Sequence, residues 1–393
     1  MPTISTAERR ARLALRHRLA PGHRAADVVE AAESLVALHA TDQPTIHLST
    51  WARVDSMTTA DVDRALYDDR TLVKHMAMRR TLWVVPRATL AAVQAGASER
   101  VADRERRKLV ADVERAGLRR DGARWLAAAC DAVLATLADG REATMAELRS
   151  ELPLLEGSIS YGEGKSWAGK MPVGPRVLTV LSAEGRIVRA SNDGSWAVSR
   201  PRWASTAAWL GEPIEPLSEQ EGTARLVERW LRSFGPGTER DVKWWLGSTL
   251  RAVRRALEQV GAVAVGLDGG ATGWVLPDDL DAPAPIAPWA ALLPSLDPTT
   301  MGWAERDWYL GPHHAQLFDS AGNAGPTAWW DGRIVGGWRQ RDDGSVELQL
   351  LEDPGADGRA ALEAEAERLT AWFDGRRVLH RFPSPLSKAL AEG

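Results

Sequence analysis

Three stretches of the chain repeat one pattern of polar and hydrophobic positions. Each begins with a Thr followed three residues later by Asp or Glu, the spacing of a helix capping box, as in Thr58 and Asp61 of the first stretch. Helical spacing of apolar residues follows, and then two short strand-like segments around a basic or glycine-containing turn. This order of helix, turn, helix and hairpin is typical of a winged helix. Its recurrence at intervals of about 90 residues predicts three such domains in tandem.

The segments outside these stretches differ in composition. Residues 89–138 are rich in Ala, Arg, Glu and Leu, which predicts a bridging pair of helices, and the Gly- and Ser-rich residues 156–175 predict a long loop. After a proline-rich linker, segments such as "HAQLFDS" and "RVLHRF" are interpreted as strands, with one helix near the end. We therefore expect an α+β protein with winged helices at 1–88, 139–212 and 213–281, a helical connector at 89–138 and a C-terminal β-rich α+β domain at 282–393.

Composition narrows the class of protein. A chain of 393 residues, 44% hydrophobic and 26% charged, is too long for one core, and its apolar runs are too short to cross a bilayer. The N-terminus lacks the apolar region of a secretory signal, so we expect a cytoplasmic protein without a membrane partner. A single cysteine, Cys130, excludes an intramolecular disulfide and a thiolate zinc cluster. No His-Glu-x-x-His spacing occurs, and we expect neither a metal nor a cofactor.

Charge along the chain leaves room for one basic face. The net charge of −4 argues against an indiscriminate polyanion binder, because non-specific affinity for nucleic acid comes mainly from phosphate neutralisation. Basic clusters nevertheless occur at residues 8–24, 100–109, 251–257 and 333–341. The alternative interpretation of each cluster is a solvated helix face, above all at 100–109, where acids are interleaved.

A polar break interrupts the apolar stripe "LVALHATDQP" at residues 35–44. One interpretation is structural: His39 caps the carbonyls of a helix at 27–38, and Thr41 and Asp42 cap the next helix. The other interpretation depends on a resemblance between this chain and a known family.

That resemblance rests on several motifs in order. "LVALHATDQP" is followed by "LSTWAR", then by "MAMRRTLWVVP", "GPGTERDVKWWLG", "LLPSLDPTTMGWAERDWYL" and "GNAGPTAWWDGRIVGGWRQ". Over nearly its whole length the chain resembles the winged helix DNA-binding domain family that includes the AlkZ-like DNA glycosylases. These enzymes excise alkylated purines and can unhook interstrand crosslinks. The resemblance implies three tandem winged helices curved around a DNA channel, followed by a β-rich domain.

The resemblance also implies a catalytic motif. In the characterised glycosylases the matching segment carries Gln-apolar-Gln or Gln-apolar-Asp, which positions the hydrolytic water, whereas this chain has His39, Ala40 and Thr41. A neutral imidazole can act as a general base, and a hydroxyl two positions later can orient the same water. Asp42 is the nearest carboxylate that would stabilise the positively charged sugar. No lysine lies in or beside the motif, so we expect a hydrolase and not a β-elimination lyase.

Candidate DNA contacts lie on two hairpins and one helix. The basic turns would grip phosphates or enter the minor groove, and a tryptophan would wedge or stack. Packing, a strand ladder or a buried ion pair is the alternative role for several of them. An Asp–Arg pair from among Asp297, Arg306 and Asp307 is expected to join domains. The expected DNA-binding residues are His75, Arg79, Arg80, Lys243, Arg333, Trp338, Arg339 and Arg341.

Three functions are compatible with these patterns. The leading hypothesis is a monomeric, monofunctional DNA glycosylase that hydrolyses the N-glycosidic bond of bulky or crosslinked alkylpurines in double-stranded DNA, in repair or in resistance to a genotoxin. The second is a non-catalytic winged-helix DNA-binding protein or regulator. The third is a family member that has lost activity and binds damaged DNA.

Overall fold

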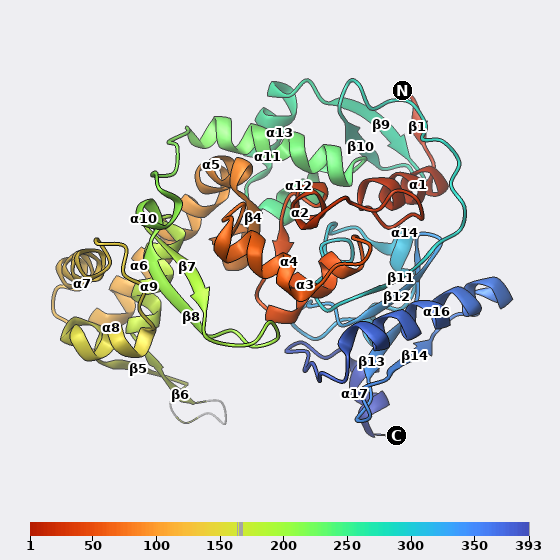
Figure 1. The fold of residues 1–393 in the computed structure, drawn as a ribbon. Coiled ribbons are helices and arrows are strands. Elements are labelled where there is room, and N and C mark those ends of the chain that lie inside the picture. The colour runs from red at the N-terminus through yellow and green to blue at the C-terminus, as the bar shows by residue number, and fades with distance from the viewer. Residues whose placement is uncertain (163, 165–167, 393) are drawn as a thin grey trace.

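The first unit is built around a short antiparallel sheet. The computed structural model describes residues 1–162, 164 and 168–392 (Figure 1). Helix α2 (Val28–Ser34) ends before the sheet begins, and the strand order is β2-β4-β3. The other elements of this part are β1 (Thr3–Ile4), α1 (Thr6–Arg16), β2 (Leu38–His39), α3 (Gln43–Trp51), α4 (Thr59–Asp63), a π-helical turn (Arg64–Asp68), β3 (Leu72–Ala77), a 3₁₀ turn (Met78–Arg80) and β4 (Thr81–Pro86).

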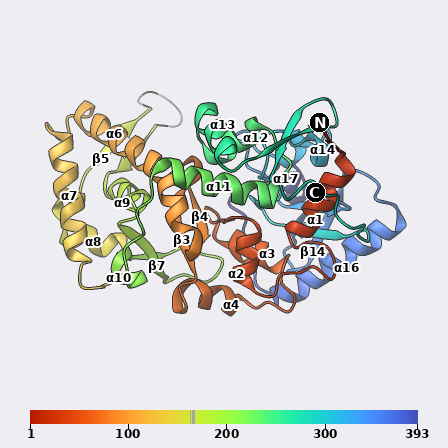
Figure 2. The ribbon, with the colours of Figure 1, turned by 90° about the horizontal axis from the view of Figure 1, so that it is seen from above.

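The second unit and its connector form a separate lobe, seen at one end of the molecule in Figures 1 and 2. Its own apolar core lies between α6, α7 and α9. The elements are a 3₁₀ turn (Arg87–Thr89), α5 (Leu90–Val93), a π-helical turn (Gln94–Ser98), α6 (Glu99–Arg115), α7 (Gly122–Thr136), α8 (Met145–Glu151), a 3₁₀ turn (Pro153–Leu155), β5 (Ser158–Tyr161), β6 (Gly169–Pro172), α9 (Gly174–Ala183), β7 (Ile187–Asn192), β8 (Pro201–Ser205) and α10 (Thr206–Leu210).

Helices α6 and α7 confirm the predicted bridging pair, but the predicted long loop at 156–175 is wrong. Strands β5 and β6 pair as an antiparallel hairpin within it. Glycine-rich composition concealed the hairpin, because only short β5 and β6 flank the turn residues. Residues 163 and 165–167 of this segment lie outside the described part of the chain.

The third unit has the same order of capped helix, second helix and hairpin as the second, without the β5–β6 hairpin between its helices. Its elements are α11 (Glu219–Phe234), α12 (Glu239–Leu246), α13 (Leu250–Gln259), β9 (Val263–Leu267) and β10 (Thr272–Val275), and β1 pairs parallel with β9. Residues Ala143 and Gly237 each stand just before a capped helix and bridge to a tryptophan in the second strand of the hairpin, Trp203 and Trp274 respectively.

The predicted capping boxes are confirmed at all three positions. The hydroxyls of Thr58, Thr144 and Thr238 begin α4, α8 and α12, with Asp61, Glu147 and Asp241 as their partners. Helix α11 then packs against the turn after α5 with glycine on both sides. A Cβ on Gly96 would lie 2.6 Å from the carbonyl carbon of Gly222, so only glycine allows this close approach between the connector and the third unit.

The C-terminal domain contains a four-stranded antiparallel sheet with the order β11-β12-β13-β14. Its helix α16 confirms the predicted helix, but "HAQLFDS" contains the short helix α15 and "RVLHRF" carries no described strand. Such short apolar segments do not distinguish helix from strand by periodicity. The elements are β11 (Ala290–Leu293), α14 (Asp307–Leu310), α15 (His314–Leu317), β12 (Thr327–Trp330), β13 (Arg333–Gln340), β14 (Val346–Leu350), α16 (Gly355–Phe373) and α17 (Pro385–Glu392).

One continuous apolar core joins the first and third units to the C-terminal domain. None of the helices that the structure describes combines the length and apolarity that a bilayer span requires. Within the described ranges, no three side chains of His, Cys, Asp or Glu gather closely enough to hold a metal ion.

Candidate functional site

The polar residues 39–43 connect a strand to a buried helix. His39 pairs with Trp83 across the β2–β4 ladder, so it belongs to a strand and does not cap the preceding helix. Asp42 occupies the N-cap position of α3 but makes no side-chain capping bond. Pro44 stands in the first turn, where its missing N–H costs no helical hydrogen bond. Every residue of α3 is buried, so the core fixes both ends of the loop.

The imidazole of His39 is held in one orientation. Only 3% of the residue is exposed, and its ring lies 4.8 Å from that of Trp83. The backbone N–H of Thr41 donates to Nδ1 at 3.4 Å. Burial, and then the charge of Arg79, lower the pKa of His39 to about 3, so the ring is neutral near pH 7. Because a backbone amide can only donate, the proton of the neutral ring resides on Nε2.

Thr41 and Asp42, the other two polar candidates of the loop, differ in the hydrogen bonds that they can make. Thr41 is half-buried, and its Oγ1 accepts from the backbone N–H of Leu82 at 3.4 Å, which leaves the hydroxyl hydrogen to donate. Asp42 is 5% exposed, and its Oδ2 accepts from the backbone N–H of Arg381 at 3.2 Å. Burial raises the pKa of Asp42 to about 6, against the lowering effect of that bond. Asp42 is therefore the group in the loop suited to accept a proton near neutral pH.

A lysine lies beside the motif in space, although none does in sequence. Lys74 of β3 donates to Oε1 of Gln43 at 3.1 Å and to the hydroxyl of Tyr67 at 2.6 Å. Burial, and then the neighbouring charge of Arg189, lower the pKa of Lys74 to about 7. The premise that no lysine adjoins the motif is therefore wrong. The sequence could not predict this contact, because it is strand pairing that brings Lys74 close to Gln43.

Aromatic rings from three parts of the chain meet around α3. Trp196, from the loop between β7 and β8, lies 5.3 Å from the ring of His47 in α3. The same tryptophan meets Trp372 of α16 at 5.2 Å, and Trp372 meets Trp51 at the end of α3 at 6.4 Å. These contacts place the hairpin loop of the second unit and helix α16 of the C-terminal domain against α3, the helix that follows the motif.

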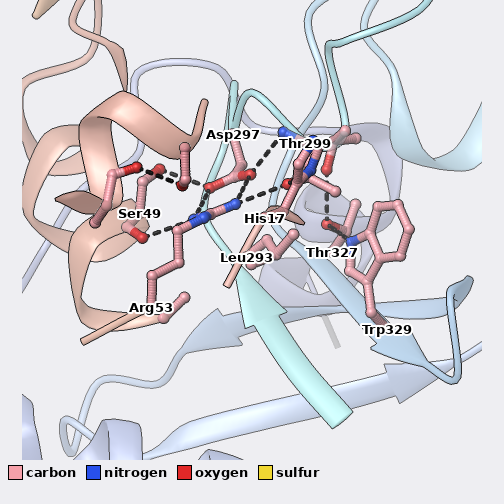
Figure 3. Close-up of polar contacts among 12 residues, drawn as sticks. His17, Ser49, Arg53, Leu293, Asp297, Thr299, Thr327 and Trp329 are labelled. Atoms are coloured by element: carbon pink, nitrogen blue, oxygen red, sulfur yellow. Dashed lines mark hydrogen bonds and ion pairs between the residues drawn. The ribbon is translucent and has the colours of Figure 1, made fainter. Parts of the chain in front are cut away.

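A buried ion pair fixes the same helix to the C-terminal domain (Figure 3). Arg53, just after α3, pairs with Asp297 at 2.8 Å, and both side chains are fully buried. Asp297 also accepts from Ser49 at 2.6 Å, and Arg53 donates to Thr299 at 2.7 Å. The hydroxyl of Thr299 in turn meets Nδ1 of His17 at 2.8 Å. Asp297 therefore joins two parts of the chain as expected, but its partner is Arg53 and not Arg306.

Five basic side chains near the loop form no ion pair with a described residue. The guanidinium groups of Arg79 and Arg306 lie over the ring of Trp244, at 4.0 and 5.0 Å from its centroid. The Nε atoms of Arg79 and Arg189 are buried without a hydrogen-bond partner. Such desolvated, uncompensated cations favour an anionic ligand. The five residues are Lys74, Arg79, Arg189, Arg306 and Arg381.

These cations lie near both ends of the polar loop. Arg79 is close enough to His39 to lower its pKa, and Arg381 bonds to Asp42 through its backbone. Burial, and then the charge of Arg381, lower the pKa of Arg189 to about 10. The strand β7 thus contributes to the same electropositive region as β3, although the two belong to different units.

Two of the expected DNA contacts are buried, which corrects their assignment. His75 is 2% exposed, because the alternation of β3 turns it away from Lys74 and into the core. Burial lowers the pKa of His75 to about 4. Trp338 is 1% exposed, and its Nε1 donates to the carbonyl of Leu293 at 2.9 Å. Neither side chain reaches the surface.

Several other expected contacts already have acidic partners. Arg339 and Arg341 share Glu347, and Arg333 pairs with Glu352. Arg80 is half-exposed and pairs with the buried Glu105 at 2.8 Å.

Of the remaining expected contacts, Lys243 is exposed on α12, and Arg79 is half-buried in the turn after β3. The structure thus brings together only Arg79 and the motif. It adds Lys74, Arg189 and Arg381, which sequence patterns did not single out, and Arg306, which was expected in an ion pair but lies over Trp244.

Comparisons with known proteins agree with this architecture. The family model described as DNA glycosylase AlkZ-like matches residues 32–372. Among solved structures, Streptomyces sahachiroi DNA glycosylase AlkZ is similar, with a TM-score of 0.74 and 21% identity over 97% of this chain and 99% of that chain, which shows a shared fold. No curated protein sequence matches. Because the family model spans most of the sequence, including the motif and all five unpaired cations except Arg381, the chain belongs to the AlkZ-like DNA glycosylase family.

Proposed function

We propose that this protein hydrolyses the N-glycosidic bond of alkylated purines in double-stranded DNA, including bulky or crosslinked adducts. The observation that supports this most directly is the loop at 39–42. It combines an imidazole N–H donor, a hydroxyl and a carboxylate whose pKa of about 6 lies near neutrality, and unpaired cations lie at both ends. We propose that this set holds and deprotonates one water beside the DNA backbone.

In the proposed reaction the water oxygen attacks C1′ of the deoxyribose as the bond from C1′ to the purine nitrogen breaks. Asp42 accepts the proton of the water, and its negative charge also stabilises the oxocarbenium-like sugar. The Nε2–H of His39 and the hydroxyl of Thr41 orient the water oxygen. An N7- or N3-alkylated purine carries a positive charge, so it leaves as a neutral base without needing a proton.

This assignment revises the roles within the motif. His39 was expected to act as the general base, but a ring whose Nδ1 accepts from Thr41 presents a donor at Nε2. The proton acceptor then becomes Asp42. Lys74 is engaged by Gln43 and Tyr67, and we assign it a positioning role, which keeps the enzyme monofunctional.

DNA would be held by three tandem winged helices. The repeated order of capped helix, second helix and hairpin supports this arrangement, as do the matching bridges of Ala143 and Gly237 to their hairpins. The unpaired Arg79 and Arg189 come from the hairpins of the first and second units, and they would meet phosphates on a curved path past the loop. We propose that the enzyme acts as a monomer and without a cofactor, in protection against a genotoxin.

A non-catalytic DNA-binding protein is the second candidate. It is favoured by the low exposure of the motif, since His39 is 3% exposed and Asp42 is 5% exposed. Under that alternative the cations bind DNA while the loop only connects β2 to α3.

Base release distinguishes the two candidates. A duplex with one N7-methylguanine is incubated with excess protein, and the free base is separated by chromatography; an unmodified duplex and heat-inactivated protein serve as controls. The proposal expects release well above spontaneous depurination, with no adduct trapped on the protein by borohydride. Tight binding without release, across N7-methyl and bulkier N7 adducts, would favour the binding protein.

A further inference from the structure

The edge of the C-terminal sheet borders a deep groove. Strand β14 pairs only with β13 among the described residues, and helix α16 runs beside it (Figures 1 and 2). Between them lies a hollow of about 1090 Å³, lined by β14 itself and by one stripe of α16. The residues of β14 are all half-buried, so this edge is neither sealed in the core nor flat on the surface.

The backbone of β14 has hydrogen-bonding groups directed into this groove. The N–H of Leu351 donates to Val335 of β13, whereas the N–H of Val346 points the other way and donates to the hydroxyl of Thr370 in α16 at 2.8 Å. The direction of the backbone N–H groups alternates along an antiparallel strand. The N–H groups of Leu348 and Leu350 therefore point to the same side as that of Val346, toward the groove. No described residue accepts from the N–H of Leu348 or Leu350, so two backbone donors of the free edge lack a partner.

The wall opposite this edge is acidic. Glu363 and Glu367 lie one helical turn apart on α16, both are exposed, and neither forms an ion pair with a described residue. Like charges at this spacing repel each other and destabilise a helix unless a cation lies across from them. Of the two arginines lining the groove, Arg341 is paired with Glu347, and Arg359 lies 3.7 Å from Asp353. The groove therefore favours a cationic occupant.

We propose that this groove binds an extended peptide segment of a partner protein, which adds as a strand to β14 and carries Lys or Arg at alternate positions. The spacing supports the pattern. Side chains on one face of an antiparallel strand repeat about every 6.8 Å, and residues four apart on a helix lie about 6 Å apart along the axis. Two basic side chains of the added strand thus match Glu363 and Glu367. Edge-strand addition supplies main-chain affinity, and the acidic wall supplies specificity.

The charge of the groove separates this surface from the proposed DNA site. Duplex DNA is polyanionic and would be repelled by the α16 wall. A second copy of this chain is a less suitable occupant, because the equivalent edge of that copy would bring its own Glu363 and Glu367 to the interface. The inference does not depend on the proposed glycosylase activity.

A synthetic peptide tests the proposal. A labelled peptide of alternating Lys and Val, six residues long, is titrated into the full-length protein while backbone amide exchange is followed. We expect binding that protects the amides of Leu348 and Leu350, with little change at Val346, which already has a partner. The Glu363→Gln/Glu367→Gln variant should bind about tenfold more weakly. The Glu228→Gln/Glu258→Gln variant, which removes two exposed acids of the third unit, should bind as the wild type does.

A peptide methylated on its strand-pairing backbone nitrogens separates strand addition from simple charge attraction. It keeps every charge, and the proposal expects it to lose most of its affinity. Equal binding of the methylated peptide would overturn the strand-addition claim, and so would equal binding by the Glu363→Gln/Glu367→Gln variant. Absence of binding by the parent peptide would overturn the whole proposal. Protection of the Leu348 and Leu350 amides by self-association at high protein concentration would overturn it too, because a second copy of the chain would then occupy the groove. Base release from alkylated DNA should be unchanged in both variants.

Discussion

The backbone N–H of Thr41 donates to Nδ1 of His39 at 3.4 Å, and this contact determines which proton the imidazole can offer. With Nδ1 occupied as an acceptor, the neutral ring presents a donor at Nε2. In the proposed reaction the carboxylate of Asp42, three residues along the chain, is then the group that accepts the proton.

On the acidic side of its pH profile, the rate of base release should follow one ionisation, that of Asp42. Asp42 must be ionised to accept a proton, and its raised pKa of about 6 means that the competent fraction falls as pH drops through that value. The rate should rise about tenfold between pH 4.5 and 5.5 and level off above pH 7. His39, with a pKa of about 3, stays neutral throughout and adds no second limb. Single-turnover rates of base release at a series of pH values measure this dependence. A half-maximal rate near pH 7.5 would contradict the role of Asp42 as the proton acceptor.

Replacing His39 should separate its donor role from a base role. His39→Gln keeps an N–H donor on a side chain of similar reach, whereas His39→Ala removes it. Loss of one preorganised donor costs roughly 10²-fold or more in rate, so His39→Ala should fall that far and His39→Gln by much less. The comparison uses single-turnover rates at saturating protein. If the two variants were equally impaired, the imidazole would be acting in some other way.

The unpaired cations should dominate DNA affinity. Arg189→Ala and Arg79→Ala should each weaken binding to any duplex and reduce the slope of log affinity against log salt by about 0.9, because each removes about one phosphate contact. Arg333→Ala is the matched control, since that guanidinium is already neutralised by Glu352. Fluorescence anisotropy between 50 and 200 mM salt measures the slopes. A larger loss in Arg333→Ala than in Arg189→Ala would place the DNA elsewhere.

The junction beneath α3 should be sensitive to the loss of one charge. Asp297→Ala leaves Arg53 buried without its partner, and breaking a buried pair in this way costs about 3–5 kcal/mol. Thermal unfolding should begin roughly 5 °C lower. The Arg53→Met/Asp297→Leu variant removes both charges and should recover much of the loss. A double variant as unstable as Asp297→Ala would mean that the hydrogen bonds of Ser49 and Thr299 matter more than the charges.

Local signals in the sequence predicted much of the fold. The capping boxes at Thr58, Thr144 and Thr238 depend on residues three apart, and all three occur as predicted. The errors came where local signals were weak: "HAQLFDS" is helical, and glycine-rich residues 156–175 contain a hairpin. Four-residue segments such as α15 and β5 are fixed by the surfaces on which they pack and not by their own periodicity.

The site was predictable only in part. His39, Thr41 and Asp42 adjoin in sequence, and the family resemblance made them the candidate site, but the roles that we propose for them depend on tertiary contacts. The N–H of Arg381 on Asp42 joins residues 339 positions apart. The approach of Lys74 to Gln43 depends in the same way on strand register. The basic cluster around residue 340 led to a wrong expectation of unpaired DNA-binding arginines, because Glu347 and Glu352 form ion pairs with them.

The most direct test of the account is single-turnover release of N7-methylguanine from duplex DNA by Asp42→Asn. Asparagine keeps the shape and can still accept from Arg381, but it cannot take a proton. We expect a loss of about 10²- to 10⁴-fold in rate with unchanged DNA affinity. Asp63→Asn, which changes a carboxylate outside the loop, should stay within a few-fold of wild type. Wild-type rates in Asp42→Asn would contradict the central claim that this loop activates the water.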